Sequence, residues 1–249
     1  MPWKMINKGK KEGEIRIYGV ITDFQMFKED TTPTGFQEEL DAMGDIELLT
    51  VYLNTPGGGT AAGNTIYNIL KRHPAVVHTK VDGIAASMGA TILQAGDERS
   101  IALNGQVFMH NPLGCICGYA SDLRKYANWL DKTQEGIMSN FSRLKIDNKK
   151  LTKIMEAETL LTANESLQMG FVDKIDDDSV DVNVENKNVT FNGVTFNADM
   201  YRHFDISKLE QYNVQNKSGN NDIEEYESRF SKMFENQIAI NNLILTKIN

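Results

Sequence analysis

The sequence predicts an α/β layer fold, because stretches with the periodicity of strands alternate along the chain with stretches of helical spacing. The strand-like segments are 14–21, 46–53, 76–81 and 106–110, and the helical ones are 35–43, 61–71 and a helix that opens within 83–90. Pro and Gly residues separate many of these segments, as is typical of turns between elements. The alternation therefore indicates a layered α/β domain.

Composition sets limits on the class of protein. The 249 residues are 41% hydrophobic and 24% charged, which is ordinary for a globular protein with a sizeable core. The net charge of -8 argues against nucleic-acid binding, because nucleic-acid binders concentrate Lys and Arg. No signal-peptide pattern opens the chain and no stretch approaches the ~18 apolar residues of a membrane span. We expect a cytoplasmic protein with protein partners and no membrane association.

The two cysteines, Cys115 and Cys117, do not predict a disulfide or a metal site. A single intervening residue makes a bond between them strained. A structural zinc site needs further ligands nearby, and the sequence around them has none. We expect two reduced thiols, no metal and no cofactor.

Apolar residues from Ser121 to Leu144 recur at three- and four-residue steps, which predicts one long amphipathic helix with Ser121 as its N-cap and Asp122 in its first turn. At 1.5 Å per residue such a helix is roughly 35 Å long, more than a compact layer needs. We therefore expect it to project from the domain.

The character of the chain changes after Asp176. Two β-rich triplets flank the pair Asn192 and Gly193, which is a strong signal for a β-hairpin. A polar stretch at 213–222 is typical of a linker, and heptad spacing of apolar residues from Ile223 onward predicts a helical tail. That tail is either a docking or inhibitory helix or a flexible segment without consequence.

Ser87 is the first candidate for chemistry, because it stands where an apolar strand gives way to a helix and small residues flank it. Such a turn exposes the hydroxyl and directs backbone N–H groups at an incoming carbonyl oxygen. The pattern only approximates the G-x-S-x-G nucleophile elbow, since Ala85 occupies the first glycine position. A serine at a helix start is more often an N-cap, so this feature alone leaves both interpretations open.

His110 strengthens the first interpretation, because it ends the strand-like run 106–110 and strand ends are where α/β folds place active groups. A serine hydroxyl needs a neighbouring base to attack a carbonyl. The other histidines, His73, His78 and His203, are assigned no catalytic role from the sequence.

Three glycines at 57–59 follow the second strand. A phosphate loop would require a Lys-Ser/Thr ending, which the following residues lack, so nucleotide hydrolysis is disfavoured. Exposed N–H groups at such a turn suit an oxyanion hole or pairing with an extended peptide.

Three segments together resemble the signature segments of the Clp peptidase family (ClpP), in the same order and with matching spacing. They are Asn-Thr-Pro-Gly-Gly at 54–58, Gly-Ile-Ala-Ala-Ser-Met-Gly-Ala at 83–90 and Met-His-Asn-Pro-Leu-Gly at 109–114. A fourth segment, from Glu158 to Ser166 followed by Gly-Phe-Val-Asp at 170–173, resembles the family's closing motif. The resemblance covers roughly residues 14 to 176.

The resemblance implies an ATP-independent serine endopeptidase with Ser87 as nucleophile and His110 as base. The third position, aspartate in most of the family, falls on Glu158, whose longer side chain must reach the histidine differently. Glu156 is a competitor for that role. The remaining implied residues are Gly58 and Met88 for the oxyanion hole, and Gly59, Thr60, Leu113 and Gly114 for the substrate strand.

The resemblance also implies the architecture: a spiral of ββα units related to crotonase, with the helix 121–144 as a projecting handle between rings. We expect a peptidase domain at 1–176, a β-hairpin extension at 177–212 and a linker with a helical tail at 213–249. A homo-oligomeric ring, heptameric or stacked as a double ring, is implied in the same way.

The extension after residue 173 and the glutamate at 158 both look like phage-encoded, Clp-like head-maturation proteases. The implied substrates are scaffold, portal or coat precursors of the phage capsid. The alternatives are a degradation-chamber subunit served by an ATP-driven unfoldase and a catalytically silent assembly protein of the same fold. A crotonase-type acyl-CoA enzyme is disfavoured, because such enzymes do not use this serine and histidine pair.

Overall fold

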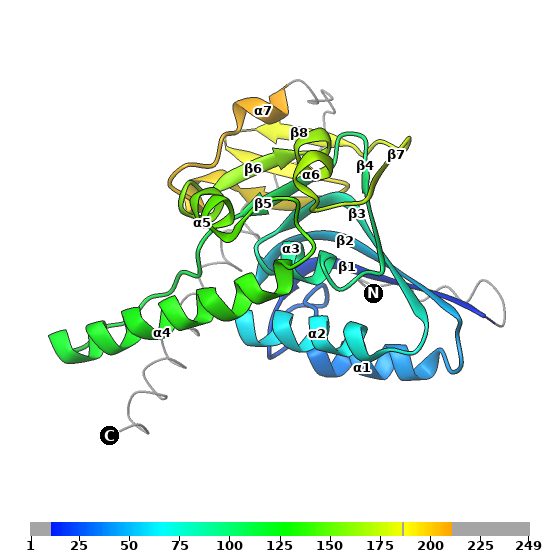
Figure 1. Ribbon diagram of the computed structural model, residues 1–249, viewed down its shortest axis with the longest axis horizontal. Helices are drawn as coiled ribbons and strands as arrows, with labels where there is room; N and C mark the ends of the chain where they lie inside the picture. The colour runs from blue at the N-terminus through cyan, green and yellow to red at the C-terminus, as the bar shows by residue number, and fades with distance from the viewer. Residues whose placement is uncertain (1–10, 186, 211–249) are drawn as a thin grey trace.

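The computed structural model describes residues 11–185 and 187–210, and the structural statements below concern these residues (Figure 1). It confirms the α/β class, with strands and helices alternating through the first half of the chain.

The strands are β1 (Glu12–Ile21), β2 (Leu48–Gly58), β3 (Val76–Ala86), β4 (Glu98–Ala102), β5 (Gln106–Met109), β6 (Thr159–Thr162), β7 (Lys174–Asp176), β8 (Val182–Glu185), β9 (Asn188–Phe191) and β10 (Val194–Asn197). The α-helices are α1 (Pro33–Ala42), α2 (Thr60–Arg72), α3 (Met88–Leu93), α4 (Ala120–Met138), α5 (Asn148–Glu156), α6 (Ala163–Met169) and α7 (Ser207–Glu210). Short 3-10 turns span Ser139–Phe141 and Ala198–Met200.

Strand β3 divides the main sheet into two branches. Its first half, around Lys80, pairs in parallel with β4, which continues to β7. Its second half, Ile84–Ala86, pairs in parallel with β5, which pairs antiparallel with β6. Strands β1 and β2 complete the sheet on the other side of β3. The forked sheet and its covering helices agree with the expected spiral architecture.

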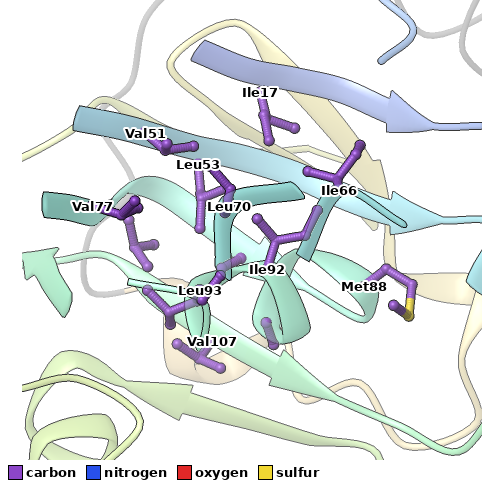
Figure 2. Packing of buried hydrophobic residues seen from close by; sticks show 14 of the residues in the cluster. Ile17, Val51, Leu53, Ile66, Leu70, Val77, Met88, Ile92, Leu93 and Val107 are labelled. Atoms are coloured by element: carbon purple, nitrogen blue, oxygen red, sulfur yellow. The ribbon is translucent and has the colours of Figure 1, made fainter. Parts of the chain in front are cut away.

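The main core lies between this sheet and helices α1, α2 and α3. Alternate residues of the parallel strands point to one face, where Leu53 and Val77 meet Ile66 and Leu70 of α2 (Figure 2). Strand residues two apart share one face of the sheet, and helix residues three or four apart share one face of the helix, so the two apolar faces pack together. Because these side chains are fully buried, they hold the carboxyl ends of β2, β3 and β5 in fixed positions.

Strands β2 and β3 are longer than the sequence predicts. The expected ends were at residues 53 and 81, but pairing continues to Gly58 and Ala86. A register shift after Leu53 and positive φ angles at Gly57 and Gly58 let the ladder pass through the Pro-Gly-Gly segment. The expected helix within 83–90 therefore begins only at Met88, and residues 83–86 are strand.

Helix α4 projects from the body as expected, but it is shorter than predicted (Figure 1). It begins after Tyr119, whose backbone N–H donates to Asp122 Oδ2 at 3.1 Å, so Ser121 is not the N-cap. It ends at Met138, and a 3-10 turn then carries Phe141 into the core against Phe171. Burial of Phe141 explains why the predicted single helix to residue 144 is broken.

The hairpin predicted around Asn192 and Gly193 is confirmed, since both residues have positive φ and join β9 to β10. Strand β8, which the sequence did not predict, adds a third strand to this small sheet. The sheet docks on the main sheet through Asn54, whose side-chain amide donates to the Phe191 carbonyl at 2.6 Å. The linker and helical tail expected at 213–249 lie outside the described residues.

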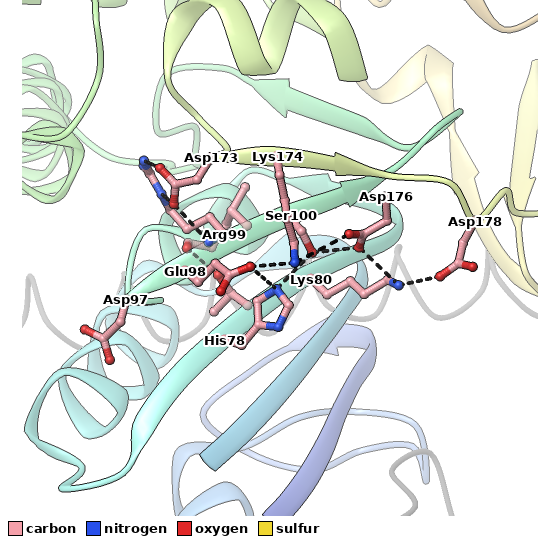
Figure 3. Close-up of polar contacts among 12 residues, drawn as sticks. His78, Lys80, Asp97, Glu98, Arg99, Ser100, Asp173, Lys174, Asp176 and Asp178 are labelled. Carbon is pink, nitrogen blue, oxygen red and sulfur yellow. Dashed lines mark hydrogen bonds and ion pairs between the residues drawn. The ribbon is translucent and has the colours of Figure 1, made fainter. Parts of the chain in front are cut away.

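A polar network joins β3, β4 and β7 on the other branch of the sheet (Figure 3). The Arg99 guanidinium, 2% exposed, binds both carboxylate oxygens of Asp173. Lys80 pairs with Asp176 and Asp178, and His78 Nε2 lies 3.0 Å from Ser100 Oγ. These contacts fix the closing segment 170–176 to the sheet and give His78 a structural role.

Candidate active site

Ser87 occupies the turn between β3 and α3 in a backbone conformation that non-glycine residues rarely adopt, with φ 52° and ψ -118°. Its N–H donates to the Phe108 carbonyl at 2.9 Å, which ties the turn to the end of β5. Ser87 stands at the N-cap position of α3, yet its side chain makes no capping hydrogen bond. Strain of this kind costs of order 1–3 kcal/mol and clusters at functional sites. The capping interpretation of Ser87 is therefore wrong.

The glycine-rich end of β2 lies directly against this turn. A Cβ on Gly57 would stand 2.6 Å from Ser87 Cβ and 3.0 Å from the Met88 nitrogen, so only glycine allows the approach. Gly58 follows with φ 146° and its Cβ position overlaps the Ile21 carbonyl. Met88 is the first residue of α3, and the helix itself provides no acceptor for its N–H. Gly58 and Met88, the expected oxyanion-hole pair, thus belong to adjacent segments.

His110 lies at the same edge of the sheet as Ser87. It follows β5 directly, and β5 runs parallel to β3 with Phe108 opposite Ala86. The imidazole Nδ1 is 2.6 Å from the Asn111 carbonyl oxygen. Since a carbonyl can only accept, Nδ1 carries the proton and Nε2 presents a lone pair. Nε2 is buried and has no hydrogen-bond partner among the described residues, which leaves it available as a base.

The environment of His110 favours the neutral ring. Burial lowers the pKa of His110 below its ordinary value, although the Asn111 carbonyl and the Glu158 carboxylate both act to raise it. A general base works in its unprotonated form, so a lowered pKa lets His110 act as a base down to a lower pH.

We expect the acidic limb of kcat/KM for peptide cleavage to fall below pH 6.5, the ordinary pKa of histidine. As pH drops through the lowered pKa, His110 gains a proton and activity is lost. The pH profile of the free enzyme measures this directly. Glu158→Gln is the internal control, because removing a negative charge near the ring should move the limb to still lower pH. A limb at or above pH 6.5 in the wild type would contradict the buried neutral histidine.

Glu158 is close enough to act on His110 by its charge, but it is not the partner of Nδ1. Its carboxylate Oε2 accepts the backbone N–H of His203 at 2.9 Å instead. Glu158 also has a positive φ of 48°, which is unusual for a glutamate. Glu156, the competitor for the same role, is exposed at the end of α5. The sequence did not predict that the Asn111 carbonyl, in place of a carboxylate, is the partner of His110 Nδ1.

The residues expected to flank the substrate are placed on two segments. Gly59 and Thr60 lie at the start of α2, directly after the glycine-rich end of β2. Leu113 is 48% exposed in the irregular segment between β5 and α4. A Cβ on Gly114 would overlap the Tyr126 side chain, so this glycine packs closely against the base of α4.

Two residues of the C-terminal extension reach the site and were missed by the sequence analysis. Tyr201 packs on the His110 ring with centroids 4.9 Å apart, and His203 supplies its backbone N–H to Glu158. The sequence contains aromatic residues after the hairpin, but it does not indicate which residues they contact.

Neither Cys115 nor Cys117 forms a disulfide bond within the described residues. Within residues 11–185 and 187–210, no group of three or more His, Cys, Asp or Glu side chains is placed to hold a metal ion. In the same ranges, no helix is long and apolar enough to cross a membrane.

Comparison with known proteins agrees with the architecture. The model of the Clp protease family matches residues 36–179, more than half of the chain. The ATP-dependent Clp protease proteolytic subunit of Borrelia garinii subsp. bavariensis is 37% identical over 172 residues, covering 66% of this chain and 84% of that protein. The subunit of the same name from Borreliella afzelii is 37% identical over 145 residues, covering 56% and 71%. The chain therefore belongs to the Clp protease family of serine-type endopeptidases.

Proposed function

We propose that Ser87 is the nucleophile of this endopeptidase, that His110 is its general base, and that the N–H groups of Gly58 and Met88 form the oxyanion hole. The observation that carries the proposal is the strained, uncapped Ser87 turn, held against Gly57 and beside β5, the strand that directly precedes His110. A capping serine or a solvent-facing histidine would need neither the strain nor the buried Nε2.

The chemistry follows from these positions. His110 Nε2 takes the proton of the Ser87 hydroxyl as Oγ bonds to the substrate carbonyl carbon, and the carbonyl oxygen becomes an oxyanion. The N–H groups of Gly58 and Met88 donate to that oxyanion. The imidazolium then protonates the leaving amine, and the C–N bond breaks to give an acyl-enzyme. Water, deprotonated by His110, releases the acid and restores Ser87.

Glu158 assists by charge in this scheme. Its carboxylate stabilises the imidazolium that forms while the Ser87 proton resides on His110. The Asn111 carbonyl fixes the tautomer, a task that the carboxylate performs in the familiar triad.

The substrate in this proposal is an extended peptide that passes between the Gly59 and Thr60 segment and the Leu113 and Gly114 segment. Both segments adjoin the proposed catalytic residues in the chain, and irregular or glycine-rich backbone there can pair with a peptide strand.

For the biological role we propose limited cleavage of phage scaffold, portal or coat precursors in the host cytoplasm. The support is the extension at 177–212, because its three-stranded sheet lies entirely beyond the family match, which ends at residue 179. An added domain that packs on the proposed active site suits an enzyme with few substrates better than a general degradation chamber.

A second role is favoured by the names of the relatives, which are proteolytic subunits of ATP-dependent proteases. In that case the chain supplies the peptidase and an unfoldase supplies folded substrates. The two roles are separated by offering the assembled enzyme either phage capsid precursors without ATP or a stably folded tagged protein with an unfoldase and ATP. Discrete cuts in the precursors alone support maturation, whereas ATP-dependent digestion to short peptides supports the second role.

We propose that the chain works as a homo-oligomeric ring, heptameric or stacked as a double ring, with α4 between rings. Helix α4 projects from the body (Figure 1). It presents large exposed apolar side chains, Leu123 at 44% and Trp129 at 45%. Large apolar side chains exposed together on a projecting helix favour contact with another protein surface.

Trp129→Asp should therefore shift the assembly to smaller species at equal protein concentration, with peptidase activity lowered if the ring supports the site. Multi-angle light scattering measures the mass. The control is Lys132→Asp on the same helix, where a charged, exposed side chain is replaced. Equal masses for wild type and both variants would exclude α4 as an assembly surface.

A further inference from the structure

The segment that follows the β9–β10 hairpin packs on the proposed catalytic histidine. The Tyr201 ring lies 4.9 Å from the His110 ring, tilted by 58°, and 4.6 Å from the Phe108 ring in an edge-on arrangement. Phe108 itself stacks with His110 at 5.7 Å. The imidazole thus contacts two aromatic rings, one from β5 and one from the C-terminal extension.

Two residues further on, the same segment binds the carboxylate that acts on His110. The backbone N–H of His203 donates to Glu158 Oε2 at 2.9 Å. The extension is also fastened to β6 downstream, where Lys208 Nζ donates to the Leu160 carbonyl at 2.8 Å. Because Leu160 lies two residues after Glu158, the fastening holds the N–H donor and the carboxylate in register.

We propose that Tyr201 and the backbone N–H of His203 are positioning groups for His110 and Glu158, so that the C-terminal extension forms part of the active site. The inference rests on the catalytic roles proposed above. The Tyr201 ring restricts rotation of the imidazole and keeps water from it, while the N–H holds the Glu158 carboxylate where its charge reaches the ring.

Few titratable groups of the described residues act on the His110 imidazole. Glu158 is the charged side chain of the described residues that acts on His110, and Tyr201 is the other titratable side chain packed against the ring. Removing the Tyr201 ring admits water, so the protonated imidazole becomes easier to form. The acidic limb of activity should then move upward.

The test measures the rate constant for labelling of Ser87 by a fluorophosphonate probe from about pH 5 to 8. Tyr201→Ala should lose roughly tenfold or more in rate and shift the acidic limb toward the ordinary histidine pKa. Tyr201→Phe keeps the ring and should restore both. Phe204→Leu is the matched control, since Phe204 contacts Phe108 and Tyr201 within the same aromatic cluster. It should lower thermal stability without moving the limb.

The N–H donor is tested by a second pair of variants at one exposed position. His203→Ala removes the imidazole and keeps the N–H, whereas His203→Pro removes both. The proline variant alone should label more slowly, with its oligomer intact by light scattering. If wild type labels at Ser87 but Tyr201→Ala behaves as Phe204→Leu does and the two His203 variants agree, the positioning role is overturned while the proposed function stands. If assembled wild type is not labelled at Ser87, the proposed function itself fails.

Discussion

Ser87→Ala should abolish peptide cleavage, with a loss of about 10⁵-fold or more in kcat, because it removes the hydroxyl held at the strained turn beside the end of β5. Alanine removes only the oxygen atom, so the fold and the oligomer should persist. Hydrolysis of a fluorogenic peptide by enzyme of equal oligomeric mass measures the effect. Ser121→Ala, which changes an exposed serine at the start of α4, is the control and should retain full activity.

The same position predicts an inverse relation between activity and stability. A φ of 52° with ψ of -118° is strained for serine and permitted for glycine. Ser87→Gly should therefore be inactive and as stable as Ser87→Ala or more stable, despite the greater backbone entropy that glycine loses on folding. A glycine variant markedly less stable than the alanine variant would contradict the strain assigned to this turn.

Asp173→Ala should destabilise the fold by about 3–5 kcal/mol, because it leaves the buried Arg99 guanidinium without its carboxylate. Arg99 Nε and Nη2 donate to the two oxygens of Asp173 at 3.0 and 2.6 Å (Figure 3). The Arg99 backbone N–H donates to the same carboxylate at 3.0 Å, and Arg143 Nη2 adds a fourth donor at 3.1 Å. Urea unfolding at one protein concentration gives the free energy of unfolding.

The control for this effect is Asp178→Ala, which removes an exposed carboxylate that pairs with Lys80. Exposed ion pairs contribute about 0–1 kcal/mol, so this variant should stay close to wild type. Burial alone raises the pKa of Asp173, but the hydrogen bonds and charges of Arg99 and Arg143 outweigh it and hold that pKa below its ordinary value. The stabilisation should thus be complete above about pH 4 and disappear as pH falls further. Equal losses in the free energy of unfolding of Asp173→Ala and Asp178→Ala would show that burial of the Arg99 guanidinium adds nothing to the effect.

The sequence predicted most strands and helices of the first 110 residues, because their side chains alternate or repeat with clear periods, but it did not predict β4. Its errors have physical causes. Gly57 and Gly58 were expected to end β2, yet glycine can also bend a strand without breaking its pairing, and the neighbouring Ser87 turn requires that bend. The predicted helix from Ser121 to Leu144 ignored the burial of Phe141, which depends on tertiary contacts with Phe171.

The candidate site could be predicted only in part. Ser87 and His110 were identified because each stands at the carboxyl end of a strand-like run, and adjacent parallel strands bring these ends together. The Asn111 carbonyl contact to His110 was not foreseeable, since it depends on a backbone turn. The contacts from Tyr201 and His203 were equally hidden, because more than 40 residues separate them from Glu158 and no periodicity links the two segments.

The most direct measurement is the site of covalent labelling in the assembled wild-type enzyme. A fluorophosphonate probe is added to enzyme whose oligomeric mass is confirmed by light scattering, and the modified peptide is identified by mass spectrometry. The account predicts a single adduct on Ser87, formed far more slowly in His110→Ala. An assembled enzyme that cleaves peptides but carries its adduct on another serine, or that labels equally fast without His110, would contradict it.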